Sequence, residues 1–233
     1  MKKILLLTIV ILFPITMESQ KSVQGFTMGV NLGNWIGDDK LFAEELAYSV
    51  NLAMGSSDFT FASTSRIGFS MGMFLDYHLG KSLSVQPELL FSQKGAKFSG
   101  TGTMEYDGDY YSTEEDLIIQ LDYIDLVLLA KYAFGNGNTR PYIVAGPGVG
   151  YLVTSKMKVH VTVEGESDTE TTEVEGYRTI DPYVNAGVGL DFSKSLRIEF
   201  RYYYFLNPVS REDADAVFTI FNSVKAINIV AYF

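Results

Sequence analysis

The sequence predicts an all-β fold, an eight-stranded antiparallel up-and-down β-barrel that spans a membrane. Apolar side chains alternate with small or polar ones over long stretches, most regularly from Ile67 to Leu79, and a period of two is typical of a strand. Beyond the N-terminal region, no apolar run is long enough for a transmembrane helix. A chain without such a helix can cross lipid only as a closed barrel. The predicted connections also alternate between short and long.

The N-terminus has the pattern of a secretory signal peptide. Lys2 and Lys3 precede an apolar stretch from Ile4 to Ile15, which is shorter than the ~20 residues of a spanning helix. We therefore expect residues 1–19 to be removed rather than kept as a membrane anchor. The cut site stays open, because the residues before Gln20 fit the small-residue rule poorly. Residues 20–233 are expected to form a single barrel domain.

Eight segments alternate as strands do. They cover residues 24–35, 67–79, 83–94, 117–134, 140–153, 182–192, 196–204 and 223–233. Seven of them have an apolar face, which consists in chain order of Phe26, Met28, Val30 and Leu32; Ile67, Phe69, Met71, Met73, Leu75, Tyr77 and Leu79; Leu83, Val85, Pro87, Leu89 and Phe91; Ile143, Ala145, Pro147, Val149 and Tyr151; Val184, Ala186, Val188, Leu190 and Phe192; Leu196, Ile198, Phe200, Tyr202 and Tyr204; and Ile227, Ile229, Ala231 and Phe233. The fourth segment contains the apolar run Leu126–Ala130 instead. The fourth segment is the least regular. Asp122 and Asp125 fall on opposite faces there, which indicates a bulge.

The connections give the barrel a direction. Three are tight, at residues 79–82, 135–139 and 193–195, and their Gly, Asn and Ser content suits hairpin turns. Four are long, at residues 36–62, 99–116, 155–181 and 206–222. All long connections fall at one end, which is typical of bacterial membrane barrels with short periplasmic turns and long external loops.

The seventh strand separates two kinds of barrel. One of its faces carries Arg197, Glu199 and Arg201, and the other is apolar. A soluble barrel would put the charged row outside, whereas a membrane barrel puts it inside. The positions of the glycines favour the membrane barrel. Glycine weakens a strand without benefit on an exposed surface, whereas inside a small barrel it leaves room for long side chains. The glycines on the non-apolar faces are Gly25, Gly29, Gly33, Gly68, Gly72, Gly146, Gly148, Gly150, Gly187 and Gly189.

We therefore predict a lumen filled by a paired polar network. Its candidate members are Glu88, Lys94, Lys131, Asp191, Arg197, Glu199 and Arg201. Buried charges persist only when they are paired, so Glu88 and Asp191 are the expected partners of the arginines. The alternative is a pathway for ions or a substrate, but eight strands enclose room only for side chains.

Three segments resemble a family of eight-stranded outer-membrane barrels of Bacteroidetes-type bacteria, the porin-family or PorT-family proteins. They are LSVQPELLFSQKGAK at 83–97, LDYIDLVLLAKYAF at 121–134 and RPYIVAGPGVG at 140–150. The second lacks the proline usual in that family. The resemblance implies residence in the outer membrane and insertion by the barrel-assembly machinery, which reads the aromatic end of the last strand, here Phe233. It implies no reaction.

The remaining chemistry points away from catalysis. A formal charge of −10 argues against nucleic acid as a partner, and the absence of cysteine excludes disulfides and thiolate metal sites. An enzyme acting on lipid or peptide would have to use His78 or His160, and no nucleophile motif surrounds any serine. We expect no catalytic residue, no cofactor and no resident metal.

The long connections carry the acidic residues. Two of them hold Glu105, Asp107, Asp109, Glu114, Glu115 and Asp116, and Glu164, Glu166, Asp168, Glu170, Glu173 and Glu175. An external protein, or Ca²⁺ or Mg²⁺ bridging to lipopolysaccharide, is a possible partner there, although a merely solvated surface explains the charges too. Residues 161–174 alternate Thr with Glu and could instead extend a hairpin. The sequence favours a non-catalytic structural, adhesive or partner-binding surface protein, with a narrow porin as the alternative.

Overall fold

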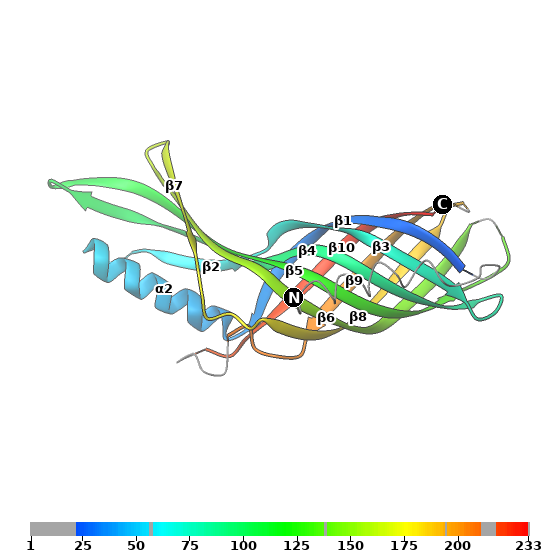
Figure 1. The fold of residues 1–233 in the computed structure, drawn as a ribbon. Coiled ribbons are helices and arrows are strands. Elements are labelled where there is room, and N and C mark those ends of the chain that lie inside the picture. Colours follow the sequence, from blue (N-terminus) through cyan, green and yellow to red (C-terminus); the bar gives the residue numbers. More distant parts are fainter. Residues whose placement is uncertain (1–21, 56–57, 138, 194, 211–217, 233) are drawn as a thin grey trace.

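The computed structural model describes residues 22–232 except 56–57, 138, 194 and 211–217. The predicted signal peptide and Phe233 lie outside these residues. Eight strands close into a ring in which every neighbour is antiparallel (Figure 1). They are β1 (Ser22–Gly37), β3 (Arg66–His78), β4 (Leu83–Tyr106), β5 (Asp109–Ala133), β6 (Arg140–Val163), β8 (Ile180–Asp191), β9 (Leu196–Phe205) and β10 (Ile220–Tyr232). The predicted fold class is confirmed.

The ring closes between its first and last strands. β1 pairs with β10 from Gly25 opposite Tyr232 to Gly37 opposite Ile220, so no edge is left open along the barrel wall. The three tight hairpins lie together at what we call the turn end. The backbone N–H of Leu79, of Phe134 and of Phe192 closes them, at 2.8–3.0 Å from the accepting carbonyl oxygen.

The opposite end, which we call the extended end, is more ordered than the sequence suggested. The segments 36–62, 99–116 and 155–181 were expected as loops, and this was wrong. The first contains helix α2 (Asp39–Met54) and β2 (Thr60–Thr64), the second continues the β4–β5 hairpin, and the third contains the end of β6 and β7 (Glu166–Glu173). Of the fourth loop, 206–222, residues 211–217 lie outside the described part and β10 already begins at Ile220.

Two tight turns explain why the acidic segments 99–116 and 155–181 form hairpins. Asp107 and Gly108 have φ of 53° and 86°, and Glu164 and Gly165 have φ of 50° and 90°. An X-Gly pair with two positive φ values forms the two-residue turn that matches the twist of antiparallel strands. The Thr-Glu alternation therefore belongs to a hairpin, as the alternative interpretation held.

Beyond the barrel the strands form a second structure, the extension sheet. Its order is β2, β4, β5, β6 and β7, where β2 pairs with residues 97–101 of β4 and β7 pairs with residues 156–163 of β6. Figure 1 shows the β4–β5 hairpin and β7 projecting away from the barrel, with α2 beside β2. Within the described residues, no helix is both long and apolar enough to cross a membrane.

The barrel wall has the predicted orientation. Its apolar row faces outward, for example Phe26, Met28 and Val30 at 50–60% exposure. The glycine row faces inward, and two members show why. A Cβ at Gly189 would lie 2.1 Å from the Tyr142 ring, and one at Gly148 would lie 2.4 Å from the Tyr183 ring. Glycine thus makes room for a tyrosine of the neighbouring strand rather than of the opposite wall.

The predicted bulge is displaced to the partner strand. Asp122 pairs with Thr154 but Tyr123 pairs with Leu152, so the additional residue is Val153 of β6 and not a residue of β5. β5 keeps its alternation throughout, with Leu121, Tyr123 and Asp125 all buried inside. Asp122 and Asp125 fall on opposite faces simply because they are three residues apart.

Candidate functional site

The barrel lumen is filled in successive layers of side chains. All seven residues predicted for the polar network lie in it, six of them at most 5% exposed and Asp191 half-buried. The layer nearest the turn end is built around Arg197 of β9. Its guanidinium donates to Gln86 Oε1 at 3.0 Å and to Asp76 Oδ2 at 2.9 Å, and its Nε lies 3.5 Å from Asp191 Oδ1.

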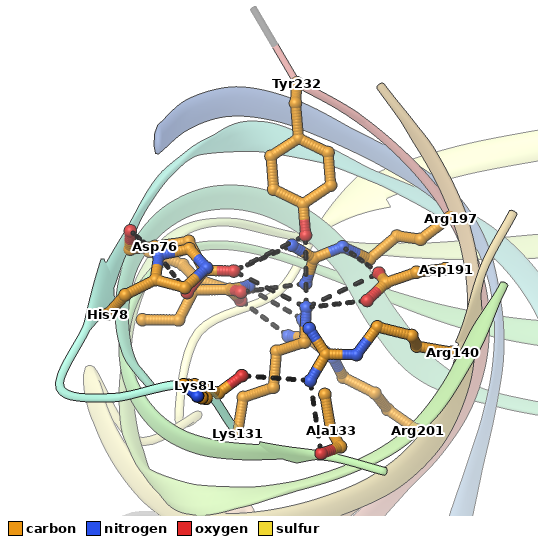
Figure 2. A network of polar contacts seen from close by, with 12 residues as sticks. Asp76, His78, Lys81, Lys131, Ala133, Arg140, Asp191, Arg197, Arg201 and Tyr232 are labelled. Atoms are coloured by element: carbon orange, nitrogen blue, oxygen red, sulfur yellow. Dashed lines mark hydrogen bonds and ion pairs between the residues drawn. The ribbon is translucent and has the colours of Figure 1, made fainter. Parts of the chain in front are cut away.

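Lys131 of β5 completes this first layer (Figure 2). Its ammonium lies 3.4 Å from Asp191, 3.5 Å from Asp76 and 3.2 Å from the Tyr232 hydroxyl. The Tyr232 ring also covers the Arg197 guanidinium at 4.0 Å from the ring centroid. Two cations and two carboxylates from four strands therefore neutralise one another across the lumen, which is what burial of charge requires.

The middle layer is a second charged group. The Arg201 guanidinium donates to both oxygens of Glu88, at 2.5 and 2.7 Å, and its Nε donates to Glu199. Such a bidentate arginine–carboxylate pair is strong and fixed in geometry. Arg197, Glu199 and Arg201 alternate along β9, so the strand periodicity places all three charges on the inner wall.

The third layer joins polar and aromatic groups. Lys94 Nζ lies 2.7 Å from Asp125 Oδ1, and the Ser92 hydroxyl donates to the other oxygen of Asp125. The ammonium lies 4.3–4.9 Å from the ring centroids of Tyr123, Tyr183 and Phe205. Three aromatic rings around a desolvated ammonium add cation–π attraction to the ion pair.

At the extended end an apolar plug closes the lumen. Trp35 lies at its centre, 5.7 Å from the Phe98 ring and 5.8 Å from Phe42 of α2. The indole N–H donates to Asn222 Oδ1 at 3.1 Å, and the Asn222 amide donates to Asp181 Oδ2 at 3.2 Å. The plug also contains Ala43, Ala96, Leu117, Ile119, Leu121, Tyr123, Val209 and Ile220.

Sequence reasoning missed three of the buried carboxylates, Asp76, Asp125 and Asp181. Asp76 shares the face of Gly68 and Gly72, and Asp125 shares the face of Lys131, so their periodicity could have identified both. The continuous apolar run after Asp125 obscured the alternation that would have placed its side chain on the inner face. Asp181 lies just before the first predicted residue of its strand, where no alternation marks an inner face.

The hydrogen bonds given by the structure to Ser155 and Asp168, the serine and the acid near His160 in sequence, do not involve that histidine. His160 Nδ1 lies 2.7 Å from the Thr169 hydroxyl, while the Ser155 hydroxyl donates to the Val174 carbonyl. Asp168 accepts the backbone N–H of Thr169. His78 lies at the turn end with its ring 45% exposed. Within the described part of the chain, no three His, Asp or Glu side chains are placed to hold a metal ion.

One ion pair of the extension sheet gives a pH-dependent prediction. Lys97 Nζ lies 2.7 Å from Asp116, and the Ser99 hydroxyl donates to the same carboxylate at 2.7 Å. Partial burial would raise the pKa of Asp116, but the hydrogen bonds from Lys97 and Ser99 outweigh it and lower the pKa below its usual value. A lowered pKa stabilises the fold above the unfolded-state pKa, and this stability is lost as the pH falls through the folded-state pKa.

We therefore expect the variant Lys97→Met to raise the pKa of Asp116 and to cost at most about 1 kcal/mol near neutral pH, because the pair is partly solvated. NMR titration of the Asp116 carboxyl measures the first and urea unfolding the second. Lys40→Met on α2 is the control. An unchanged Asp116 titration in Lys97→Met would contradict the assigned ion pair.

Comparison with known proteins places these features in a family. A model described as "Outer membrane protein beta-barrel domain" matches residues 19–211. The comparison with curated proteins gave no match. Among solved structures, the attachment invasion locus protein Ail of Yersinia pestis is 11% identical, with a TM-score of 0.36 and coverage of 92% of this chain and 100% of that one.

Two further solved structures are similar at the same level. Neisserial surface protein A is 13% identical, with a TM-score of 0.38 and coverage of 90% and 97%. OprG of Pseudomonas aeruginosa is 11% identical, with a TM-score of 0.33 and coverage of 91% and 94%. The assignment of the barrel rests on the strand pairing described above and not on these likenesses.

Proposed function

Because the chain belongs to the outer membrane protein beta-barrel domain family and lies in the cell outer membrane, we propose that it is a non-catalytic surface protein that acts through its extension sheet and conducts no solute. In barrels of this kind the short turns face the periplasm and the long segments face outward. The turn end is then periplasmic, and the extension sheet with α2 is extracellular.

The observation that carries this proposal is the filled lumen. Two charged layers, a lysine held among aromatic rings and an apolar plug follow one another from the turn end to the extended end. The charged side chains of these layers are paired rather than lined up as free ligands for a passing ion. A membrane protein whose interior is closed in this way has its accessible surface at its two ends.

The extension sheet is the larger of these surfaces. All eight residues of β7 are exposed, and four of them are acidic: Glu166, Asp168, Glu170 and Glu173. This composition favours an external protein with basic groups, or lipopolysaccharide bridged by Ca²⁺ or Mg²⁺, as the partner. We further propose that the chain is a Bacteroidetes PorT-type member that the barrel-assembly machinery inserts, on the three sequence segments that resemble that family.

A genetic complementation experiment tests the role of the extension sheet. One strain of the source bacterium carries a shortened chain without residues 101–114 of the β4–β5 hairpin. A second carries the lumen variant Glu88→Gln/Glu199→Gln/Arg201→Met, which leaves no unpaired charge in the middle layer and does not change the barrel surface. The shortened chain should show the defect of a strain that lacks the protein, whereas the lumen variant, once folded, should behave as the parent does. Full complementation by the shortened chain would contradict the proposal.

A narrow porin is the second candidate, and one observation favours it. Several buried polar atoms of the lumen make no hydrogen bond within the described part of the chain: Asp181 Oδ1, Asn185 Oδ1 and the hydroxyl of Tyr183. Such atoms are ligands that a small polar solute could use in transit.

Planar-bilayer recording separates the two candidates. We expect the purified chain to give no single-channel steps. Steps that change in the triple variant Glu88→Ser/Glu199→Ser/Arg201→Ser would establish a porin and overturn the proposal. The matched control is Glu114→Ser/Lys158→Ser/Glu166→Ser in the extension sheet, which removes the same number of charges of each sign from outside the lumen.

A further inference from the structure

The periplasmic end of the barrel contains a blind vestibule that the surface role leaves unused. It is a cavity of about 440 Å³, within the ~300–1,000 Å³ range of pockets that hold small molecules. Val23, Leu83 and Ala133 supply apolar wall, and the layer of Asp76, Lys131 and Asp191 forms its floor. Above that floor lie the filled layers, so the vestibule ends inside the barrel.

Two buried polar atoms at this vestibule make no hydrogen bond within the described part of the chain. One is the acceptor Asp76 Oδ1, on a side chain that is 1% exposed, and the other is the donor Arg140 Nε. His78 Nδ1 lies 4.0 Å from Asp76 Oδ1, beyond hydrogen-bond distance. An unsatisfied buried donor or acceptor is costly, so each of these atoms favours a ligand that would complete it.

Their surroundings hold both groups in place. Asp76 is fixed through its other oxygen by Arg197 at 2.9 Å. The Arg140 guanidinium is held by its terminal nitrogen, which donates to the carbonyl oxygens of Lys81 and Ala133 at 3.1 and 3.3 Å. Figure 2 shows Asp76 and His78 on one side of the opening and Arg140 on the other, with Lys131 between them. Both residues line the vestibule, so a ligand seated in it would have a carboxylate and a guanidinium among its neighbours.

The charges of the lining restrict the chemistry of such a ligand. Lys81, Lys131 and Arg140 are cationic, and Asp76 and Asp191 are anionic. A purely anionic ligand would be repelled by Asp76, whose Oδ1 accepts no hydrogen bond, and a purely cationic one would be repelled by Arg140 and Lys81. A ligand with an ammonium group and a carboxylate satisfies both sides, because charge-assisted hydrogen bonds form at each.

We propose that the vestibule binds a zwitterionic amino acid or short peptide from the periplasm, with its ammonium on Asp76 Oδ1 and its carboxylate on Arg140. The same chemistry is available from free peptides and from the peptide stems of the cell wall. The site lies at the opposite end from the extension sheet and does not depend on the role proposed for that sheet.

Ligand analogues test this on the unaltered protein. The full chain in detergent micelles is titrated with alanylalanine by calorimetry, and also with its N-acetyl form and its C-terminal amide. We expect saturable binding of the dipeptide and a loss of about 10- to 100-fold in affinity for each blocked form, since each leaves one charged group in the vestibule without its partner. Soluble cell-wall fragments that bind more tightly than the dipeptide would identify the wall as the source, and weaker binding would identify free peptides.

Variants locate the site. Asp76→Asn should lower the affinity for the dipeptide more than the affinity for its N-acetyl form. Arg140→Gln should lower the affinity for the dipeptide more than the affinity for its C-terminal amide. Glu170→Gln, on the exposed β7, is the matched control and should bind as the parent does. Absence of saturable binding by the dipeptide, equal binding of a neutral sugar or of the doubly blocked peptide, or unchanged binding in both vestibule variants would overturn the proposal.

Discussion

Replacing Arg201 with methionine is expected to lower the free energy of unfolding by about 3–5 kcal/mol, because it leaves Glu88 and Glu199 as buried carboxylates without a cation. Both carboxylates are at most 4% exposed, and Arg201 is the cation that bonds to each of them. Equilibrium urea unfolding of the chain in lipid vesicles measures the loss.

Two further variants show whether charge is the cause. Adding Glu88→Gln and Glu199→Gln to Arg201→Met should recover most of the lost stability, since a neutral layer of similar volume removes the uncompensated charge. Lys225→Met, which removes an outward-facing cation from β10, should change stability much less. If Arg201→Met and Lys225→Met had equal costs, the charged middle layer would not be what holds the barrel interior together.

Replacing Trp35 with alanine is the second large change, expected to cost about 3–5 kcal/mol, as for a large aromatic side chain removed from a packed core. Trp35 is 4% exposed and contacts the rings of Phe42, Phe98 and Tyr177. Its removal leaves a cavity in the plug and also leaves the side-chain amide oxygen Oδ1 of Asn222 without its donor.

The conservative variant Trp35→Phe separates these two effects. It keeps a ring in the plug but removes the N–H, so we expect a smaller cost of about 1–3 kcal/mol for the unsatisfied Asn222. Tyr110→Ala, in the exposed part of the β4–β5 hairpin at 71% exposure, should be close to neutral. Urea unfolding again gives the values, and a cost below about 1 kcal/mol for Trp35→Ala would contradict a packed plug.

Much of the barrel could be predicted because apolar and polar side chains alternate along the consecutive residues of its strands. The eight segments, their inner faces and the row of Arg197, Glu199 and Arg201 all followed from a period of two. Glycine rows indicated which face was crowded. The extension sheet was missed because its acidic residues led us to expect solvated loops. Residues 157–163 of β6 do alternate Met and Val with Lys, His and Thr, and the Asp-Gly and Glu-Gly turns lie within the acidic segments.

Only part of the pairing across the lumen could be predicted. Glu88 and Asp191 were expected to pair with the arginines, and Arg201 does bond to Glu88, which is 113 residues away. The bond of Arg197 to Asp76, which is 121 residues away, was missed. The helix α2 was likewise not expected, although it supplies Phe42 and Ala43 to the plug. The choice of partner for a charge across the lumen and the packing of α2 against the plug both depend on distant residues, so neither produces a local sequence pattern.

Features that depend on consecutive residues could therefore be predicted from the sequence, and features that depend on distant residues could not. Side-chain periodicity, a property of consecutive residues, specified the strands, the lipid-facing rows and the charged interior. Ring closure determines which charged side chains meet, because the register of β1 against β10 and of the seven other strand pairs of the ring fixes the height of every inward side chain. The layered network, the plug around Trp35 and the vestibule between Asp76 and Arg140 exist only once that register is set, since each is assembled from strands that are distant in the chain.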